Sequence, residues 1–126
     1  MQQELPVIQK TYDLIRWYVP IFNRLPKDHR FGLGERMTKT LYELLEGLIQ
    51  ARYSRKEKLS RLQFLNTHLD ILCYQTRLLL DFELISLDRY DYAGQQLRSV
   101  GQDLGGWIKS MRQKTADRRP DTEATI

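Results

Sequence analysis

The sequence predicts an all-α protein, an antiparallel up-down-up-down bundle of four helices. In four stretches of the 126-residue chain, apolar residues recur at alternating steps of three and four, the spacing of one helix face. Seven Gly and four Pro are too few for the turns of an all-β protein of this length. A mass of 15.1 kDa fits one domain around a single hydrophobic core. Four helices joined by short connectors pack most simply as a bundle.

The first predicted helix has two neighbouring apolar stripes, which would let it face more than one partner helix. One stripe contains Leu5, Ile8, Tyr12, Ile15, Val19 and Phe22, and the second contains Leu14, Tyr18, Ile21 and Leu25. Pro6 fits a first helical turn, whereas Pro20 removes the hydrogen bond to the Arg16 carbonyl and predicts a kink. Residues 26–34, with one Pro and two Gly, are predicted to form a connector.

The second and third predicted helices each have a main stripe and a flanking apolar line, and the polar residues 52–58 form a turn between them. The main stripe of the second helix is Leu33, Met37, Leu41, Leu44, Leu48 and Ala51, widened by Tyr42, Leu45 and Ile49. The main stripe of the third is Leu62, Leu65, Leu69, Leu72, Thr76 and Leu79, flanked by Phe64, His68, Ile71, Leu78 and Phe82. We expect the third helix to end near Leu84.

The fourth predicted helix starts after Ser86, whose hydroxyl suits an N-cap, and Asp88 adds an acid to its first turn. Its apolar stripe is Ala93, Leu97, Val100, Leu104, Trp107 and Met111. The pattern stops after Lys114. The sequence therefore predicts a bundle domain over 1–114 and a disordered polar tail over 115–126.

The formal charge of +4 is concentrated in two groups of basic residues. Each group has five bases and one acid, so each has a net charge of +4 and the rest of the chain has −4. The first group is Arg52, Arg55, Lys56, Lys58 and Arg61, and the second is Lys109, Arg112, Lys114, Arg118 and Arg119. In the predicted topology both groups lie at one end of the bundle, where they could bind phosphates. Bases at helix C-termini that only complement the helix dipole are the alternative.

The opposite end of the predicted bundle is expected to be acidic. It holds the connector between the third and fourth helices, where four acids stand against Arg89. The acids are Asp81, Glu83, Asp88 and Asp91.

Three glycines, Gly94, Gly101 and Gly105, share one face of the fourth helix. Each costs about 1 kcal/mol of helix propensity relative to Ala, so we expect a close approach of another helix or subunit there, with Trp107 packing beside it. A bend at Gly105 is the alternative.

Five aromatic residues lie off the main stripes, and oligomerisation would bury some of them. They are Trp17, Tyr53, Tyr74, Tyr90 and Tyr92.

Catalytic patterns are missing from the sequence, so we expect neither an enzyme nor a bound cofactor or metal. The two histidines, His29 and His68, form no Glu-x-x-His pair, and Cys73 has no activating neighbour. Gly32 and Gly34 lack the third glycine of a phosphate-binding loop. No apolar run is long enough for a membrane span or a signal peptide, and a single cysteine suggests a reduced, cytoplasmic setting.

Several segments resemble a known family. They are LPKDHRFGLGERM (25–37), TLYELLEGLIQA (40–51), LISLDRYDY (84–92) and VGQDLGGWIKS (100–110). Over residues 5–114 the chain resembles the Avd-like accessory proteins of diversity-generating retroelements. The rRNA intervening-sequence proteins share this fold and much of the pattern, but the LGGWIKS ending and the Leu-rich second helix favour the Avd-like side.

The resemblance implies a homopentameric barrel of bundles that does no chemistry itself. It would bind the retroelement's reverse transcriptase and, with little sequence preference, template RNA and cDNA during mutagenic copying. The family has bases on the third helix; Arg77 matches, whereas Cys73 one turn earlier is not basic. The alternative is a structural oligomer of the intervening-sequence type that binds no nucleic acid.

Overall fold

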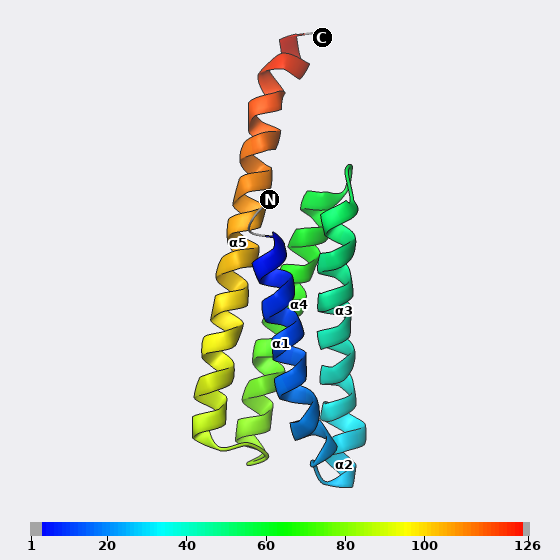
Figure 1. Ribbon diagram of the computed structural model, residues 1–126, viewed down its shortest axis with the longest axis vertical. Helices are drawn as coiled ribbons and strands as arrows, with labels where there is room; N and C mark the ends of the chain where they lie inside the picture. Colours follow the sequence, from blue (N-terminus) through cyan, green and yellow to red (C-terminus); the bar gives the residue numbers. More distant parts are fainter. Residues whose placement is uncertain (1–3, 125–126) are drawn as a thin grey trace.

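A computed structural model describes the chain over residues 4–124 and its side chains over residues 6–116. Its elements are α1 (Glu4–Asn23), α2 (Lys27–His29), the π-helical turn η1 (Arg30–Gly34), α3 (Glu35–Tyr53), α4 (Lys58–Asp81) and α5 (Leu87–Ala124). The long helices α1, α3, α4 and α5 run alternately in opposite directions (Figure 1), and the described residues contain no strand. Helix α1 packs against α3 and α5, as does α4. The predicted antiparallel four-helix bundle is confirmed.

The core confirms the main stripes of the second and third predicted helices. Every residue of these two stripes that lies on α3 or α4 is buried, and Leu33, which lies in η1, is half-buried. On α1 the second stripe is confirmed, since all four of its residues are buried. Among its described side chains, the first stripe is buried only at Ile15 and Phe22, while Tyr12 is 50% exposed, and the sequence missed Val7 and Thr11, which are fully buried. Thr11 can be buried because its hydroxyl donates to the Val7 carbonyl at 2.8 Å.

One buried hydrogen bond crosses the bundle between α1 and α4. The Tyr18 hydroxyl lies 2.6 Å from the Thr76 Oγ1, and both side chains are buried. The Thr76 hydroxyl in turn donates to the Leu72 carbonyl at 2.7 Å. Burial, which disfavours the charged phenolate, raises the pKa of Tyr18 above its ordinary value of 10.0.

The predicted connector over 26–34 is helical in the structure. The Arg30 N–H donates to the Pro26 carbonyl at 2.8 Å, and α2 and η1 continue into α3. None of the described glycines has a positive φ, so Gly34 is not a turn residue. A Cβ on Gly34 would lie 3.2 Å from the Leu25 Cδ1, which shows that the glycine permits close packing of this turn on the end of the first helix.

Helix α5 begins as predicted but ends later. The Arg89 N–H donates to the Ser86 Oγ at 3.2 Å, which confirms the N-cap. The predicted end at Lys114 is wrong, because α5 continues to Ala124 and projects beyond the other helices (Figure 1). The apolar stripe stops where no neighbouring helix remains, so it marks the end of the packed part of α5 and not the end of the helix. The last two residues of the predicted tail, 125–126, lie outside the described residues, as do the side chains after Ala116.

Some of the five aromatic residues that lie off the main stripes are packed within the bundle. The Trp17 ring lies edge-on to Tyr18 at 4.9 Å and 5.2 Å from Tyr92 on α5, so it packs between helices of the same chain. Tyr90 is also half-buried against the core. Tyr53 and Tyr74 remain exposed.

Candidate nucleic-acid interface

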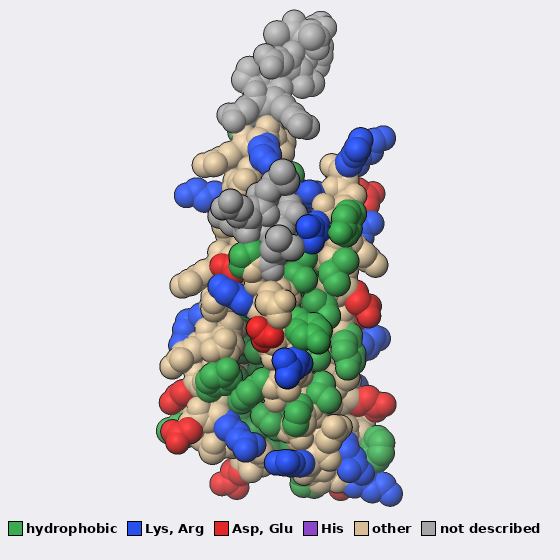
Figure 2. Space-filling model, in the orientation of Figure 1, with side chains coloured by type: hydrophobic (Ala, Val, Ile, Leu, Met, Phe, Trp, Pro, Cys, Tyr) green, Lys and Arg blue, Asp and Glu red, His purple; other side chains and the backbone are tan. Residues whose placement is uncertain are grey.

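The α3–α4 turn and the C-terminal half of α5 lie at the same end of the bundle (Figure 1). The Lys58 Nζ lies 5.9 Å from the centre of the Trp107 ring, a contact that joins the two elements, and also donates to the Arg52 carbonyl at 3.3 Å. Lys and Arg side chains surround this end of the molecule (Figure 2). We call it the basic end: Arg52, Arg55, Lys56, Lys58 and Arg61 from the turn, with Lys109, Arg112 and Lys114 from α5. The side chains of Arg118 and Arg119 lie outside the described residues.

The turn presents its cations to solvent. Helix α3 ends at Tyr53 and Ser54 is extended, with φ −82° and ψ 138°, so that Arg55 and Lys56 stand exposed at the tip. Arg52 and Lys58 are half-buried. The Arg61 Nη2 lies 3.4 Å from the Glu57 Oε2, but both groups are exposed and such a pair adds little stability.

The helix dipole does not explain all of these positions. Arg52 lies in the last turn of α3, where a cation is favourable. Lys58 and Arg61, however, lie in the first turn of α4, which contains no acid. Cations there face the positive end of the helix dipole, so the dipole by itself disfavours them, although Glu57 at the N-cap, 3.4 Å from Arg61, offsets part of this effect. An anion bound at this end would relieve that repulsion.

The opposite end is mixed in charge, and the prediction of an acidic end was wrong. The α4–α5 turn does bring Asp81, Glu83, Asp88 and Asp91 there. The connection from α1 to α3, however, adds Arg24, Lys27 and Arg30 to the same end, and red and blue side chains alternate there in Figure 2.

Arg77 is not part of the basic end. It is exposed on α4, sixteen residues after Arg61, which corresponds to a rise of about 24 Å along the helix. The structure therefore places the residue that the family resemblance singled out near the opposite end.

Another helix approaches closely, as predicted, at only one of the three glycines of α5. A Cβ on Gly101 would lie 3.3 Å from the Leu69 Cδ2 of α4. A Cβ on Gly94 would meet only Arg98 of its own helix, and one on Gly105 would meet nothing within 4 Å. Trp107 is 3% exposed and belongs to the core, so it packs between helices of one chain.

The tightest glycine contact is one that the sequence did not single out. A Cβ on Gly47 of α3 would overlap the Leu65 side chain, with the Leu65 Cδ1 at 3.1 Å and Cγ at 3.2 Å. Gly47 lies beside the Leu-rich stripe. A glycine in the middle of an apolar helix can indicate a close contact with a neighbouring helix, so the sequence did contain a signal for this one.

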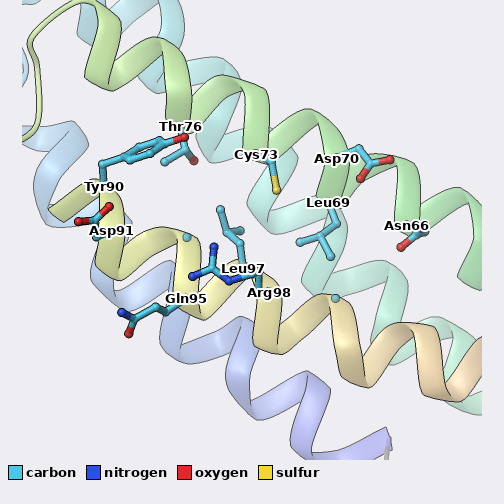
Figure 3. Close-up of a pocket in the computed structure, with 12 residues that line it drawn as sticks. Asn66, Leu69, Asp70, Cys73, Thr76, Tyr90, Asp91, Gln95, Leu97 and Arg98 are labelled. Atoms are coloured by element: carbon cyan, nitrogen blue, oxygen red, sulfur yellow. The ribbon is translucent and has the colours of Figure 1, made fainter. Parts of the chain in front are cut away.

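A cavity of about 510 Å³ lies between α4 and α5 (Figure 3). Asp70, Cys73 and Arg98 line it. Burial and, to a smaller extent, the negative charge of Asp70 raise the pKa of the Cys73 thiol, and Arg98 offsets part of this rise. The raised pKa disfavours the reactive thiolate. Over the described part of the chain, no three His, Cys, Asp or Glu side chains are placed to hold a metal ion. None of the described helices is long and apolar enough to cross a bilayer.

Two exposed aromatic rings adjoin the basic end. Tyr53 is 74% exposed, and Phe64, which the sequence placed in a flanking apolar line, is 64% exposed. Their positions beside basic residues, directly after Arg52 and three residues after Arg61, were visible in the sequence.

Comparisons with known proteins agree with the bundle. A family model described as bAvd-like matches residues 5–111. A solved protein of unknown function from the S23 ribosomal protein family of Bacteroides thetaiotaomicron superposes with a TM-score of 0.76. It is 16% identical, and the match covers 85% of this chain and 98% of that one, a likeness that concerns the fold alone. No curated protein sequence matches this one.

Proposed function

Because the chain belongs to the bAvd-like family, we propose that it is a non-enzymatic accessory subunit of a diversity-generating retroelement. In this role it binds the element's reverse transcriptase. Through the basic end it binds template RNA and cDNA with little sequence preference, because cations that contact phosphates do not read bases. It acts in the cytoplasm as a homopentamer.

The observation that carries the nucleic-acid part of this proposal is the placement of cations at the start of α4. Lys58 and Arg61 oppose the helix dipole, and Arg55 and Lys56 extend the same surface into solvent. A polyanion would interact favourably with this concentration of positive charge. Release of counterions from the nucleic acid then drives binding.

An exposed apolar strip supports self-association. It runs along α1 and α3, where hydrophobic side chains gather in Figure 2. Tyr12, Tyr42 and Ile49 are exposed on these helices, and Ile8, Val19 and Leu45 are half-buried. Contact with another subunit would remove this surface from water, and each added subunit would contribute another basic end.

The test of nucleic-acid binding compares two triple variants with the same change in charge. One is Arg55→Gln, Lys56→Gln, Arg61→Gln at the basic end, and the other is Arg24→Gln, Lys27→Gln, Arg30→Gln at the opposite end. Fluorescence anisotropy with labelled RNA and DNA is measured over a series of salt concentrations. We expect the first variant to bind more weakly, with a slope of log affinity against log salt that is smaller by about 2 to 3, and the second to bind as the wild type does.

Equal losses in both variants would show that only net charge matters and would contradict the placement. Capture of the neighbouring reverse transcriptase by the tagged protein tests the second part of the proposal. An oligomer that binds neither nucleic acid nor the polymerase would contradict the proposal and favour a structural protein of the intervening-sequence type.

A further inference from the structure

Tyr53 and Phe64 each line one of two adjoining hollows on the surface. A hollow of about 520 Å³ is lined by Ile49, Tyr53 and Ser54 together with Gln50 and Arg61. A second, of about 320 Å³, contains Phe64 and His68 and shares Gln50 and Arg61 with the first. Because they share two lining residues, the two hollows adjoin each other along α3 and α4, and Arg61 lines both. We call the pair the aromatic groove.

Neither ring has a role in the core that would explain its position. Both rings lie outside the buried cluster and expose most of their area, at the part of the surface where cations are most concentrated. The Arg52 guanidinium carbon lies 5.5 Å from the centre of the Tyr53 ring, so the ring already has a cation at its side. Large exposed rings among cations have the composition of a surface that binds nucleic acid by stacking and charge together.

Charge limits how far such a ligand can extend along the groove. Beyond Phe64, the groove is lined by Glu43 and Glu46, and the His68 Nε2 lies 3.4 Å from the Glu43 Oε1. Carboxylates repel phosphates, so a nucleic-acid backbone must stay on the side of Arg61 and the α3–α4 turn. Only the bases can reach toward Phe64.

These features favour single strands over duplexes. Bases within a duplex are already stacked on one another, and their faces cannot meet a protein ring, whereas unpaired bases can. We propose that the aromatic groove stacks unpaired bases of RNA or DNA on Tyr53 and Phe64 while Arg61 and the turn hold the phosphates. This inference rests on the proposed function and adds the class of nucleic acid, single-stranded, that the basic end prefers.

The other end of the bundle offers a matched control. Phe31 is 60% exposed, and the Arg30 guanidinium carbon lies 5.1 Å from its ring centre, much as Arg52 lies beside Tyr53. The acids of the α4–α5 turn share that end, so phosphates are not concentrated there. Phe31→Ala thus removes an exposed ring that has a neighbouring arginine, as Tyr53 does, without changing the basic end.

The experiment measures the affinity of Tyr53→Ala, Phe64→Ala and Phe31→Ala for labelled oligouridylate, oligothymidylate and a duplex. We expect the first two variants to bind each single strand at least about five-fold more weakly. Their duplex affinity and their salt slope should stay at the wild-type values, because no charge is removed. Phe31→Ala should leave all three affinities unchanged. Tyr53→Trp, which keeps an aromatic ring at this position, should bind single strands as tightly as the wild type does.

Several results would overturn the inference. They are an unchanged single-strand affinity, an equal loss for the duplex, or the same loss in Phe31→Ala. A loss that accompanies a change in oligomer size by light scattering, or normal oligonucleotide binding with loss of the polymerase, would assign the rings to a protein contact and also refute it. If the Arg55, Lys56 and Arg61 variant loses binding and the aromatic variants do not, the proposed function stands and this inference alone fails.

Discussion

The hydrogen bond between Tyr18 and Thr76 permits a quantitative test of the core. Because the Thr76 hydroxyl donates its proton to the Leu72 carbonyl at 2.7 Å, the Tyr18 hydroxyl must be the donor in the 2.6 Å bond between them. Substituting one residue therefore leaves the other with a hydrogen-bond partner, and substituting the other does not. Tyr18→Phe leaves Thr76 with its carbonyl partner, whereas Thr76→Val leaves a buried phenol with none.

The expected costs follow from that difference. Tyr18→Phe should lower the free energy of unfolding by about 1 kcal/mol, the net value of a typical hydrogen bond. Thr76→Val should cost more, about 1–3 kcal/mol, because an unpaired buried donor carries its full desolvation penalty. In the double variant no phenol remains to be satisfied. It should therefore be no less stable than Thr76→Val alone, with a coupling free energy of about 1 kcal/mol or more.

Urea unfolding of the four proteins of this cycle, followed by circular dichroism at one fixed protein concentration, measures these differences. Fixed concentration matters because an oligomer's stability depends on it. Additive single effects, or a smaller cost for Thr76→Val than for Tyr18→Phe, would refute the assignment of donor and acceptor.

Three further predictions concern ionisation and packing. Since burial raises the pKa of Tyr18 above 10.0, only the unfolded chain ionises this residue as the pH first passes that value, so stability should fall above about pH 10. Alkaline unfolding of Tyr18→Phe should show a smaller fall; equal falls would contradict this. Gly105→Ala should stabilise the protein by up to about 1 kcal/mol, since its Cβ meets open space, whereas Gly47→Ala should lower the melting temperature because it overlaps a packed leucine. Cys73 should react with a disulfide reagent at pH 8 more slowly than free cysteine, and Asp70→Asn should speed the reaction; an unchanged rate would count against the role of that carboxylate.

Periodicity predicted the core of α3 and α4 because most residues of their stripes are leucine. On α1 it failed only toward the start of the helix. Thr11 is polar by type but is buried because its hydroxyl bonds to its own backbone, whereas Tyr12, which fits the apolar spacing, is exposed. The helical connector was missed because Gly34 suggests a turn in sequence but serves close packing in the structure. Such contacts depend on which helix lies opposite, which a single sequence does not state.

The basic end could be predicted because topology alone decides which connectors share an end. The opposite end could not be predicted from the acids alone, since the cations that offset them come from a different connector. Phe64 shows a further limit: helical spacing places it beside the stripe, but only the position of the neighbouring helix shows that nothing covers it.

The hydrogen bond across the core also bears on the register of the helices. Leucines on facing stripes are nearly interchangeable, so sliding α4 by one turn, about 5.4 Å, would bury much the same apolar area. It would, however, separate the hydroxyls of Tyr18 and Thr76 and leave the phenol unpaired. The same slide would carry Lys58 away from Trp107, at the far end of the same helix. The polar pair near one end of α4 therefore helps to set where the cations at its other end stand relative to α5.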